Sequence, residues 1–417
     1  MKLKKYSLGI GDRFGHQAEA QLTAIIKAAE KGINITPVWN KSFREHNIIG
    51  SQPADVRHSA EKAVQALNWS KGYFVDADHI NLETVPHFIE SSDFFTLDVA
   101  DAIGVPPNEN DIREFLKFAE KYTQPFGIPG ILQKIAVDHK SIEKIARKYL
   151  AAVLAAADTY HYIQHNCQHD YVIELSVDET DKPQSPLELF FILSMAAWQE
   201  LPLATIAPKF SGRFNKGVDY VGDPAKFAVE FEQDVAVVKF AIKEFSLPDG
   251  LKLSVHSGSD KFSLYPHINS IITKTNAGLH LKTAGTTWLE GLIGLAAAGG
   301  EGLEIAREIY CRAYERYEEL VKPYATVVDI DRTKLPAPSV VNGWTSREYV
   351  SALRHNQSEK AYNPHLRQLL HVGYKIAAEM GERYLSALKK YAEFIAPNVT
   401  ENLYQRHIQP LFGVPVD

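Results

Sequence analysis

The chain of 417 residues carries 45 Lys+Arg against 51 Asp+Glu, a formal net charge of −6, and 45% of its residues are hydrophobic. This composition is typical of a globular protein with a core and excludes disordered and fibrous classes, and a slightly acidic chain without a basic tract lacks the charge pattern of nucleic-acid or anionic-membrane binding. The sequence contains no run of about 18 apolar residues, the length needed to cross a bilayer, and the apolar run near the N-terminus is too short for a signal peptide. We therefore expect a cytoplasmic protein without nucleic-acid or membrane partners.

Short β-rich runs, each followed by a helical pattern, recur through the first 300 residues. Eight strands are predicted, at Tyr6–Gly11, Ile35–Asn40, Tyr73–Asp78, Phe95–Asp98, Tyr171–Val177, Ala204–Phe210, Leu253–Ser257 and Gly278–Thr283. Helices are predicted between them, for example at Ala18–Lys31, Asp55–Leu67, Ser141–Ala157, Pro186–Glu200, Pro224–Phe245 and Thr287–Ala298. Strict β/α alternation implies a parallel sheet, and eight units over about 290 residues favour an α/β fold of the (β/α)₈ TIM-barrel type over an open doubly wound sheet.

The barrel is expected to form a catalytic domain over residues 1–298. The long gap between the fourth and fifth strands predicts a helical insertion at 103–170. Residues 299–417 are nearly all helical in pattern and predict a C-terminal helical extension packed on the barrel. That extension is expected to have a proline-containing break at Lys334–Pro338 and a long final helix near Asn363–Phe394.

Active sites of such barrels lie at the carboxyl ends of the strands, so the polar residues there are the candidates for chemistry. They are Asp12, Arg13 and His16; Asn40 and Lys41; Asp76, Asp78 and His79; Asp98 and Asp101; Asp178 and Glu179; Lys209 and Arg213; His256, Ser257, Asp260 and Lys261; and His280 and Lys282. Because side chains alternate along a strand, only about half of them can face the barrel axis.

A metal-ligand set can be assembled from these residues. The two cysteines, Cys167 and Cys311, are too few for a cysteine-rich site, so a metal would need histidine and carboxylate ligands. His256 and His280 come from neighbouring strands and Glu179 from two strands earlier. Two imidazoles and one carboxylate leave open positions on a divalent cation, as catalysis requires. A rival site is the Asp76, Asp78 and His79 group after the third strand.

Two other motifs resemble binding sites but do not fit them well. The run Gly9–Gly15 follows a strand and opens a helix like a dinucleotide-binding loop, but Phe14 stands where the third glycine should be. We expect instead a tight turn that brings Asp12, Arg13 and His16 over the barrel mouth, with Arg13 suited to a substrate carboxylate. His161, His165 and His169 are spaced four apart, but they lead into strand five and so are expected at the opposite end of the barrel, as a polar surface.

The chain resembles the tagaturonate epimerases of bacterial hexuronate catabolism. The resemblance rests on Leu8–Gln17, on Ser176–Thr180 and on Val255–Phe262, and it extends through the barrel into the helical tail. It implies a divalent-metal-dependent isomerase that interconverts D-tagaturonate and D-fructuronate. It further implies that Glu179, His256 and His280 hold the metal and that Asp178 accepts a proton, with Lys209 or Asp219 as the proton donor.

The resemblance also suggests a reaction. The inverted carbon is β to the ketone, so its C–H is not acidified, and metal-assisted retro-aldol cleavage and re-addition avoids that difficulty. Basic groups for the substrate carboxylate would be Arg13, Lys41, Arg213 or Lys261, beside Asp12, His16 and Asp260. The metal could be Zn, Mn, Co, Ni or Fe, and the oligomeric state is left open.

Two alternatives remain at this stage. A metal-dependent aldolase or ketose–aldose isomerase acting on a sugar acid would present the same ligands and the same polar mouth. A non-catalytic sugar-acid binding protein on the same scaffold is the other alternative, because fold does not dictate function.

Overall fold

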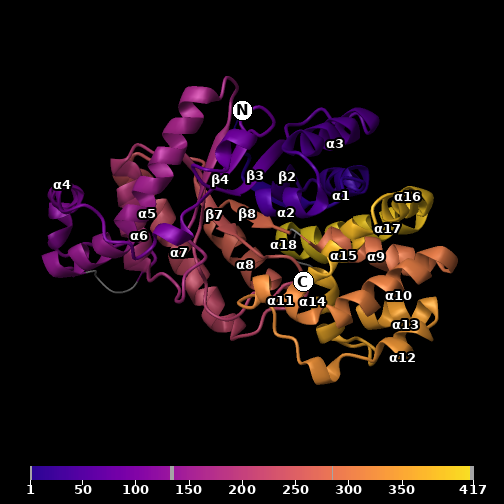
Figure 1. Ribbon diagram of the computed structural model, residues 1–417. Coiled ribbons are helices and arrows are strands. Elements are labelled where there is room, and N and C mark those ends of the chain that lie inside the picture. The colour runs from indigo at the N-terminus through magenta and orange to yellow at the C-terminus, as the bar shows by residue number, and fades with distance from the viewer. Residues whose placement is uncertain (1, 132–135, 284, 414–417) are drawn as a thin grey trace.

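A computed structural model describes residues 2–131, 136–283 and 285–413, and within these ranges eight parallel strands close into a barrel (Figure 1). Each strand pairs with the next, and β1 pairs with β8. The strands are β1 Tyr6–Gly11, β2 Ile35–Ser42, β3 Phe74–Ile80, β4 Phe94–Asp98, β5 Val172–Ser176, β6 Leu203–Ala207, β7 Lys252–Val255 and β8 Leu279–Lys282. The predicted (β/α)₈ barrel is confirmed, with small differences at the strand ends.

Helices cover the outside of the barrel and bury one continuous apolar core against it. In the first part of the chain they are α1 Ala18–Glu30, α2 Phe43–Ile49, α3 Pro53–Ala66, α4 Glu109–Ala119, α5 His139–Asn166, α6 Pro186–Trp198, α7 Pro224–Phe245, α8 Tyr265–Thr275 and α9 Thr286–Ala298. The connection from β3 to β4 differs, because its described helical turn is the short 3₁₀ helix η1, Val85–His87. The connection from β4 to β5 is the longest, with α4 lying beside the 28-residue α5.

Helix starts coincide with capping signals in the sequence. Ser185 and Glu188 form a capping box at the start of α6, with Pro186 as the first helical residue. Asp223 accepts hydrogen bonds from backbone N–H groups of the first turn of α7. Such caps stabilise a helix by about 1 kcal/mol each, and they fix where the chain leaves the strand-end loops that carry the site.

The C-terminal part forms a helical layer beside α1 and α9 (Figure 1). Its helices are α10 Gly300–Glu315, α11 Tyr317–Val321, α12 Pro338–Asn342, α13 Ser346–Leu353, α14 Pro364–Val372, α15 Tyr374–Glu379, α16 Glu382–Lys390, α17 Ala392–Glu401, the π-helical η6 Asn402–Ile408 and α18 Gln409–Phe412. The predicted break before Pro338 is present. The single long helix near Asn363–Phe394 is wrong, because the chain turns at Gly373 and again at Gly381, where φ is 55°.

The barrel interior is apolar at one end and polar at the other. Val38, Phe74, Phe94 and Val172 form a small cluster that fills the end where the strands begin. Above it lie buried polar side chains from several strands, among them Asp76, Glu174 and Lys282. None of the described helices is long and apolar enough to cross a membrane.

Candidate active site at the strand ends

Lys282 of β8 is the centre of a buried ionic cluster inside the barrel. Its Nζ lies 2.8 Å from Asp76 Oδ2, 2.7 Å from Asp78 Oδ1 and 3.1 Å from Glu174 Oε1. Its ammonium group also donates to Thr96 Oγ1 at 2.6 Å. Burial alone would lower the pKa of Lys282, but the three carboxylates raise it well above its ordinary value. Lys282 is therefore a fixed cation that links β3, β4, β5 and β8.

The surplus of carboxylates in this cluster affects the protonation of Asp76. Burial raises the pKa of Asp76 to about 7, against the lowering effect of Lys282 and with a further contribution from Asp78. The pKa of Asp78 stays well below its ordinary value, because Lys282 and His79 together outweigh the effect of burial. The lower part of the site therefore holds a carboxyl group that titrates near neutral pH beside one that stays ionised.

His79, Asp178 and His256 bring three ligand-type atoms within 4.8 Å of one another, and they are the one such histidine, cysteine or carboxylate group in the described ranges. His79 is near the end of β3, whereas Asp178 and His256 follow β5 and β7. His256 Nδ1 lies 3.4 Å from Asp178 Oδ1, and the rings of His79 and His256 are 5.0 Å apart. Two imidazoles and one carboxylate that converge from three strands can hold a divalent cation with open positions.

Each imidazole of this group has a carboxylate on its other nitrogen. His256 Nε2 lies 2.7 Å from Glu174 Oε1, and His79 Nδ1 lies 2.9 Å from Asp78 Oδ1. Metal-binding histidines usually have such a partner, which fixes the ring and its tautomer. Among the described residues His256 Nδ1 has no hydrogen-bond partner, although it is buried. The donor set therefore fits a divalent cation.

In the metal-free protein, protons on the two imidazoles balance the negative charge of the neighbouring carboxylates. Burial would lower the pKa of His256, but Asp178 and Glu174 raise it to about 10. The pKa of His79 is also raised, because Asp78 outweighs burial. Asp178 has a pKa far below its ordinary value in spite of burial, owing to the His256 charge. The protons on the imidazoles and a bound cation would therefore compete for the same negatively charged carboxylates.

Backbone strain is found at the same strand ends. His79, Ser257 and Asp260 have φ values of 55°, 49° and 62°. The pairing of β3 with β4 is irregular between Ala77 and Ile80, the part of β3 that contains His79. Left-handed backbone at non-glycine residues clusters at functional sites, because the surrounding structure must hold it in place.

The structure does not bring Glu179 and His280 into this group. Glu179 is exposed and lies outside the group. His280 faces the barrel interior, but it lies two residues before Lys282 and so deeper in the barrel. Its Nδ1 is 2.9 Å from Ser7 Oγ, and burial lowers the pKa of His280 to about 3. Of the expected ligands, His256 belongs to the group, together with His79 of the rival site and with Asp178.

Most of the site residues predicted after β1 and β2 form hydrogen bonds or ion pairs with other residues of the chain. Asp12 accepts the backbone N–H groups of Phe14 and Gln17. Lys41 Nζ donates to the backbone carbonyl of Arg13 and to a serine hydroxyl. His16 is exposed. Arg13 is buried; its Nε lies 3.1 Å from Glu45 Oε1 and its guanidinium lies 3.9 Å above the ring of Tyr374.

The loop after β6 carries three predicted residues, none of which has a described contact with the His79–Asp178–His256 group. Lys209 is half-buried and its backbone N–H donates to a glutamine side chain. Arg213 is exposed and pairs with Asp329 at 3.0 Å. Asp219 accepts hydrogen bonds from the backbone and hydroxyl of Ser263.

Asp260 and Lys261, which follow β7, are fully buried and hold the loops in place. Asp260 Oδ2 lies 3.1 Å from Arg367 Nη2 of α14. Lys261 Nζ donates to the backbone carbonyls of Asn215, Val218 and Ser259. Burial lowers the pKa of Lys261 to about 7. The two residues therefore fix the β6 and β7 loops against each other and against the C-terminal layer.

Lys216 and Glu174 are two important residues that the sequence analysis did not select. Lys216 lies in the segment that Lys261 holds, and its Nζ donates to Ser257 Oγ at 2.8 Å, next to His256. Burial and Arg13 lower the pKa of Lys216, while Asp178 and Asp78 act in the opposite direction. Glu174 could have been found from the sequence, because it is a charged residue inside the apolar strand Val172–Ser176 and lies an even number of positions before Asp178.

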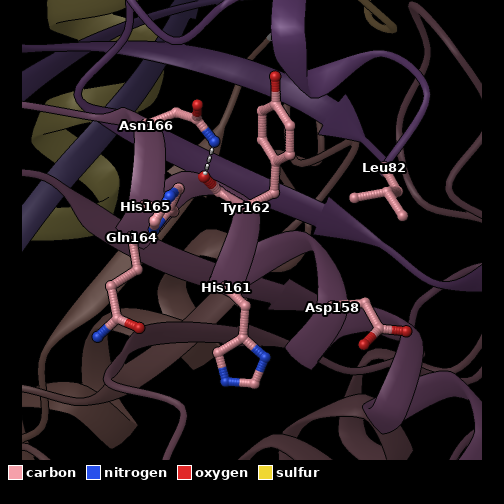
Figure 2. A pocket seen from close by; sticks show the side chains of 7 residues that line it. All are labelled: Leu82, Asp158, His161, Tyr162, Gln164, His165 and Asn166. Carbon is pink, nitrogen blue, oxygen red and sulfur yellow. Dashed lines mark hydrogen bonds between the residues drawn. The ribbon is translucent and has the colours of Figure 1, made fainter.

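A separate hollow of about 850 Å³ lies on the outer face of the barrel beside α5. Figure 2 shows Leu82, Asp158, His161, Tyr162 and His165 around it. His169 Nε2 donates a hydrogen bond to the carbonyl of Ser92, just before β4, which confirms that this histidine series ends where the strands begin. None of the strand-end residues described above lines the hollow, so it is not part of the same site.

Comparisons with known proteins agree with this architecture. A family model described as tagaturonate epimerase matches residues 1–410. A curated tagaturonate/fructuronate epimerase from Thermotoga maritima is 29% identical over 423 residues, which covers 98% of this chain and 81% of the relative. Two crystal structures of the fructuronate-tagaturonate epimerase UxaE from Cohnella laeviribosi, one native and one with glycerol, share the fold with a TM-score of 0.81 each. They are 24% and 23% identical and cover 99% of this chain and 82% of their own. The chain therefore belongs to the tagaturonate epimerase family.

Proposed function

We propose that this protein interconverts D-tagaturonate and D-fructuronate and that a divalent cation held by His79, Asp178 and His256 is required. The observation that carries the proposal is the convergence of these three side chains at the barrel mouth, with a carboxylate behind each imidazole. The family match supports the substrate pair. The exposure of Glu179 and the depth of His280 favour this ligand set over the one expected from the sequence.

The substrate chemistry explains why such a site is useful. The two sugar acids differ at the carbon β to the ketone, whose C–H bond is not acidic, so direct deprotonation there faces a high barrier. Cleavage of the bond between the α and β carbons avoids this barrier. A bound divalent cation would supply Lewis acidity, which stabilises negative charge on the ketone oxygen.

The residues of this chain can carry the proton in such a reaction. Asp178, ionised at neutral pH, would use one carboxylate oxygen for the cation and accept the hydroxyl proton of the β carbon on the other. The carbon–carbon bond then breaks, its electron pair forms the enediolate of the first three carbons, and the β carbon becomes an aldehyde. After the aldehyde turns its other face, the electron pair re-forms the bond and Asp178 returns the proton to the oxygen.

Lys216 is the cation best placed to assist. It lies beside Ser257, and the charges of Asp178 and Asp78 act on it. Its ammonium group can donate a hydrogen bond to the oxygen that alternates between hydroxyl and aldehyde. Lys216 thus takes the place expected for Lys209 or Asp219 beside this oxygen, but as a hydrogen-bond donor, since Asp178 carries the proton and the Asp219 carboxylate is engaged with Ser263.

The decisive experiment uses chelator-treated protein and D-fructuronate, with and without added Zn, Mn, Co, Ni or Fe, followed by NMR. We expect D-tagaturonate to appear when metal is added and not without it. The same reaction in D₂O should leave the inverted carbon free of deuterium, because its hydrogen never leaves the carbon. Deuterium at that carbon would contradict the cleavage mechanism. Three-carbon products alone would identify an aldolase, and no conversion with any metal would overturn the epimerase assignment.

A further inference from the structure

His371 of α14 is a buried imidazole whose hydrogen bonds are not accounted for. Its side chain is fully enclosed, yet within the described ranges neither ring nitrogen has a hydrogen-bond partner. Leaving a buried polar group unpaired costs about 1–3 kcal/mol, so such groups in native proteins need a reason. His371 is 358 residues from Arg13 in sequence, but the backbone carbonyl of His371 accepts a hydrogen bond from Arg13 Nη1 at 3.3 Å.

The imidazole is inserted between two strand-end loops at the barrel mouth. A Cβ atom on Gly285, which follows β8, would lie 2.2 Å from His371 Nε2 and 3.1 Å from Arg13 Nη2. A Cβ atom on Gly217, next to Lys216, would lie 3.3 Å from the same ring. Both glycines also have positive φ, 93° and 75°. His371 Nε2 and Arg13 Nη2 therefore meet at one point, and two glycines give them the room to do so.

The surroundings of this point are positive. The guanidinium of Arg13 and the ammonium of Lys216 both act on His371, and together with burial they hold the pKa of the imidazole well below its ordinary value. The ring is thus neutral and has an N–H to donate. Gly285 is the N-cap of α9 and provides no side-chain cap, so the first-turn N–H groups of a 13-residue helix face the same region. Glu45 neutralises part of the Arg13 charge from the other side.

The position of the ring is fixed from behind. Arg367, on the same helix, is fully buried and donates to the carbonyls of Gly217 and Leu353 as well as to Asp260. Trp288 of α9 donates to the carbonyl of Leu370 at 2.8 Å. Contacts of this kind preorganise a side chain for binding a ligand.

We infer that His371, Arg13 and the start of α9 form the subsite that binds the substrate carboxylate, so that the C-terminal helical layer contributes a substrate-contacting residue to the active site. The inference rests on the proposed epimerase function for the identity of the substrate. A carboxylate has the negative charge and the acceptor oxygens that suit an unpaired imidazole N–H beside the guanidinium of Arg13.

This placement suits the reaction proposed above. The carboxylate lies on the fragment that becomes the aldehyde, two bonds from the inverted carbon. Lys216 is close to both parts of the site: it is next to Gly217, which packs on the His371 ring, and its Nζ donates to Ser257, next to His256. A fragment held by its carboxylate can turn its aldehyde group without leaving the site.

The kinetic test compares His371→Ala and His371→Asn with the wild-type enzyme. We expect His371→Ala to raise the KM for D-fructuronate by about 10- to 100-fold, the value of a hydrogen bond to a charged group, with unchanged metal content. His371→Asn keeps a donor near the ring position and should recover part of the affinity. His365→Ala, on the same helix but bonded to the backbone of Asp331, is the matched control and should keep the wild-type KM. A KM within twofold of wild type for His371→Ala would overturn the inference while leaving the epimerase function intact.

A second test needs no turnover and measures binding to the wild-type protein. Wild-type protein labelled with ¹⁵N-histidine is titrated with D-gluconate, a sugar acid that has no ketone, and separately with D-glucitol, which has no carboxylate. We expect D-gluconate to shift a buried imidazole signal, identified as His371 by its absence from His371→Asn, and D-glucitol to leave that signal in place. If D-gluconate causes no shift, or if both compounds shift the signal equally, the carboxylate subsite is disproved whether or not the protein epimerises D-fructuronate.

Discussion

Glu174 Oε1 lies 2.7 Å from His256 Nε2, and both side chains are buried inside the barrel. Thr205 donates to the other carboxylate oxygen of Glu174 at 2.6 Å, so the carboxylate itself is held in place. This contact leaves His256 Nδ1 as the nitrogen that faces Asp178. Glu174 thus acts as a positioning residue for the proposed metal ligand.

Glu174→Gln should lower metal affinity and kcat by about 10- to 100-fold, because the amide holds the imidazole less firmly and makes it a weaker ligand. Metal titration and steady-state kinetics on the same preparation would measure both effects. Thr205→Val is the milder companion variant and should have a smaller effect in the same direction. Unchanged metal affinity in Glu174→Gln would show that the contact does not serve the metal site.

The ligand assignment can be tested by comparing His79→Asn with Glu179→Gln. We expect His79→Asn to lose most of its bound metal and its turnover, since an inward-facing ligand is removed. Glu179→Gln should retain both, because the exposed Glu179 side chain lies outside the group. Metal analysis after dialysis, with unfolding curves to confirm that both variants fold, provides the measurement. The reverse result would restore the set of Glu179, His256 and His280.

Metal binding should release protons and strengthen as pH rises. The pKa of His256 is raised to about 10 in the metal-free protein, so at pH 7 the imidazole carries a proton that the cation must displace. Below that pKa the affinity should increase by about tenfold per pH unit for each proton displaced. Calorimetric titrations at pH 6.5, 7.5 and 8.5 in buffers of different ionisation enthalpy would count the protons. An affinity independent of pH in this range would exclude His256 as a ligand that is protonated beforehand.

Lys216→Ala should reduce kcat by about 10²- to 10⁴-fold, whereas Lys209→Ala should change it little. The reason is position: Lys216 lies next to Ser257 and in the field of Asp178, whereas no described side-chain hydrogen bond ties Lys209 to the site. Both lysines are on the same loop, so each variant controls for disturbance of the other. Equal losses would indicate a general effect on the loop.

The buried pair of Asp260 and Arg367 should be important for stability. Asp260→Asn is expected to cost about 3–5 kcal/mol of unfolding free energy, because it removes the nearer charge partner of the buried Arg367 guanidinium and leaves only Glu290, at 3.8 Å. Asp329→Ala, which removes the exposed partner of Arg213, should cost no more than about 1 kcal/mol. Urea unfolding measures both changes.

The same pair should make stability depend on pH in the acid range. The pKa of Asp260 is well below its ordinary value, because Arg367 and His355 outweigh burial. A group with a lowered folded pKa stabilises the protein above its unfolded pKa, about 3.9, and loses that contribution as pH falls further. The difference in unfolding free energy between wild type and Asp260→Asn should therefore be largest at neutral pH and shrink below about pH 4. A difference that stays constant down to pH 3 would contradict this account.

The barrel could be predicted from the sequence because its signals are local. The strand Tyr6–Gly11 was predicted with the observed bounds, and the other seven within a few residues, since apolar runs and capping residues alternate regularly. The orientation of individual side chains could not be predicted as well. Asp178 and Glu179 are adjacent in sequence just after β5, but Asp178 belongs to the group with His79 and His256 whereas Glu179 is exposed.

The other positions that the sequence could not predict depend on the depth of a side chain in the barrel or on packing between distant parts of the chain. His280 and Lys282 both face the barrel axis, but a separation of two residues places His280 next to Ser7 and Lys282 among the carboxylates. His371 reaches the site through the packing of α14 on α9, which no local pattern encodes. Residues that act from the middle of a strand or from a distant helix were therefore found only in the structure.

Lys282 also limits which molecules this barrel can accept. Its ammonium group ties β8 to β3, β4 and β5 across the lumen, 5.8 Å above the ring of Phe94. It thus forms a charged floor, below which lie His280 with its Ser7 contact and the apolar cluster of Val38, Phe74, Phe94 and Val172. A longer sugar acid could extend only outward, towards the β1, β6 and β8 loops. Changes of chain-length specificity should therefore be sought in those loops, while the floor sets how deep any substrate can reach.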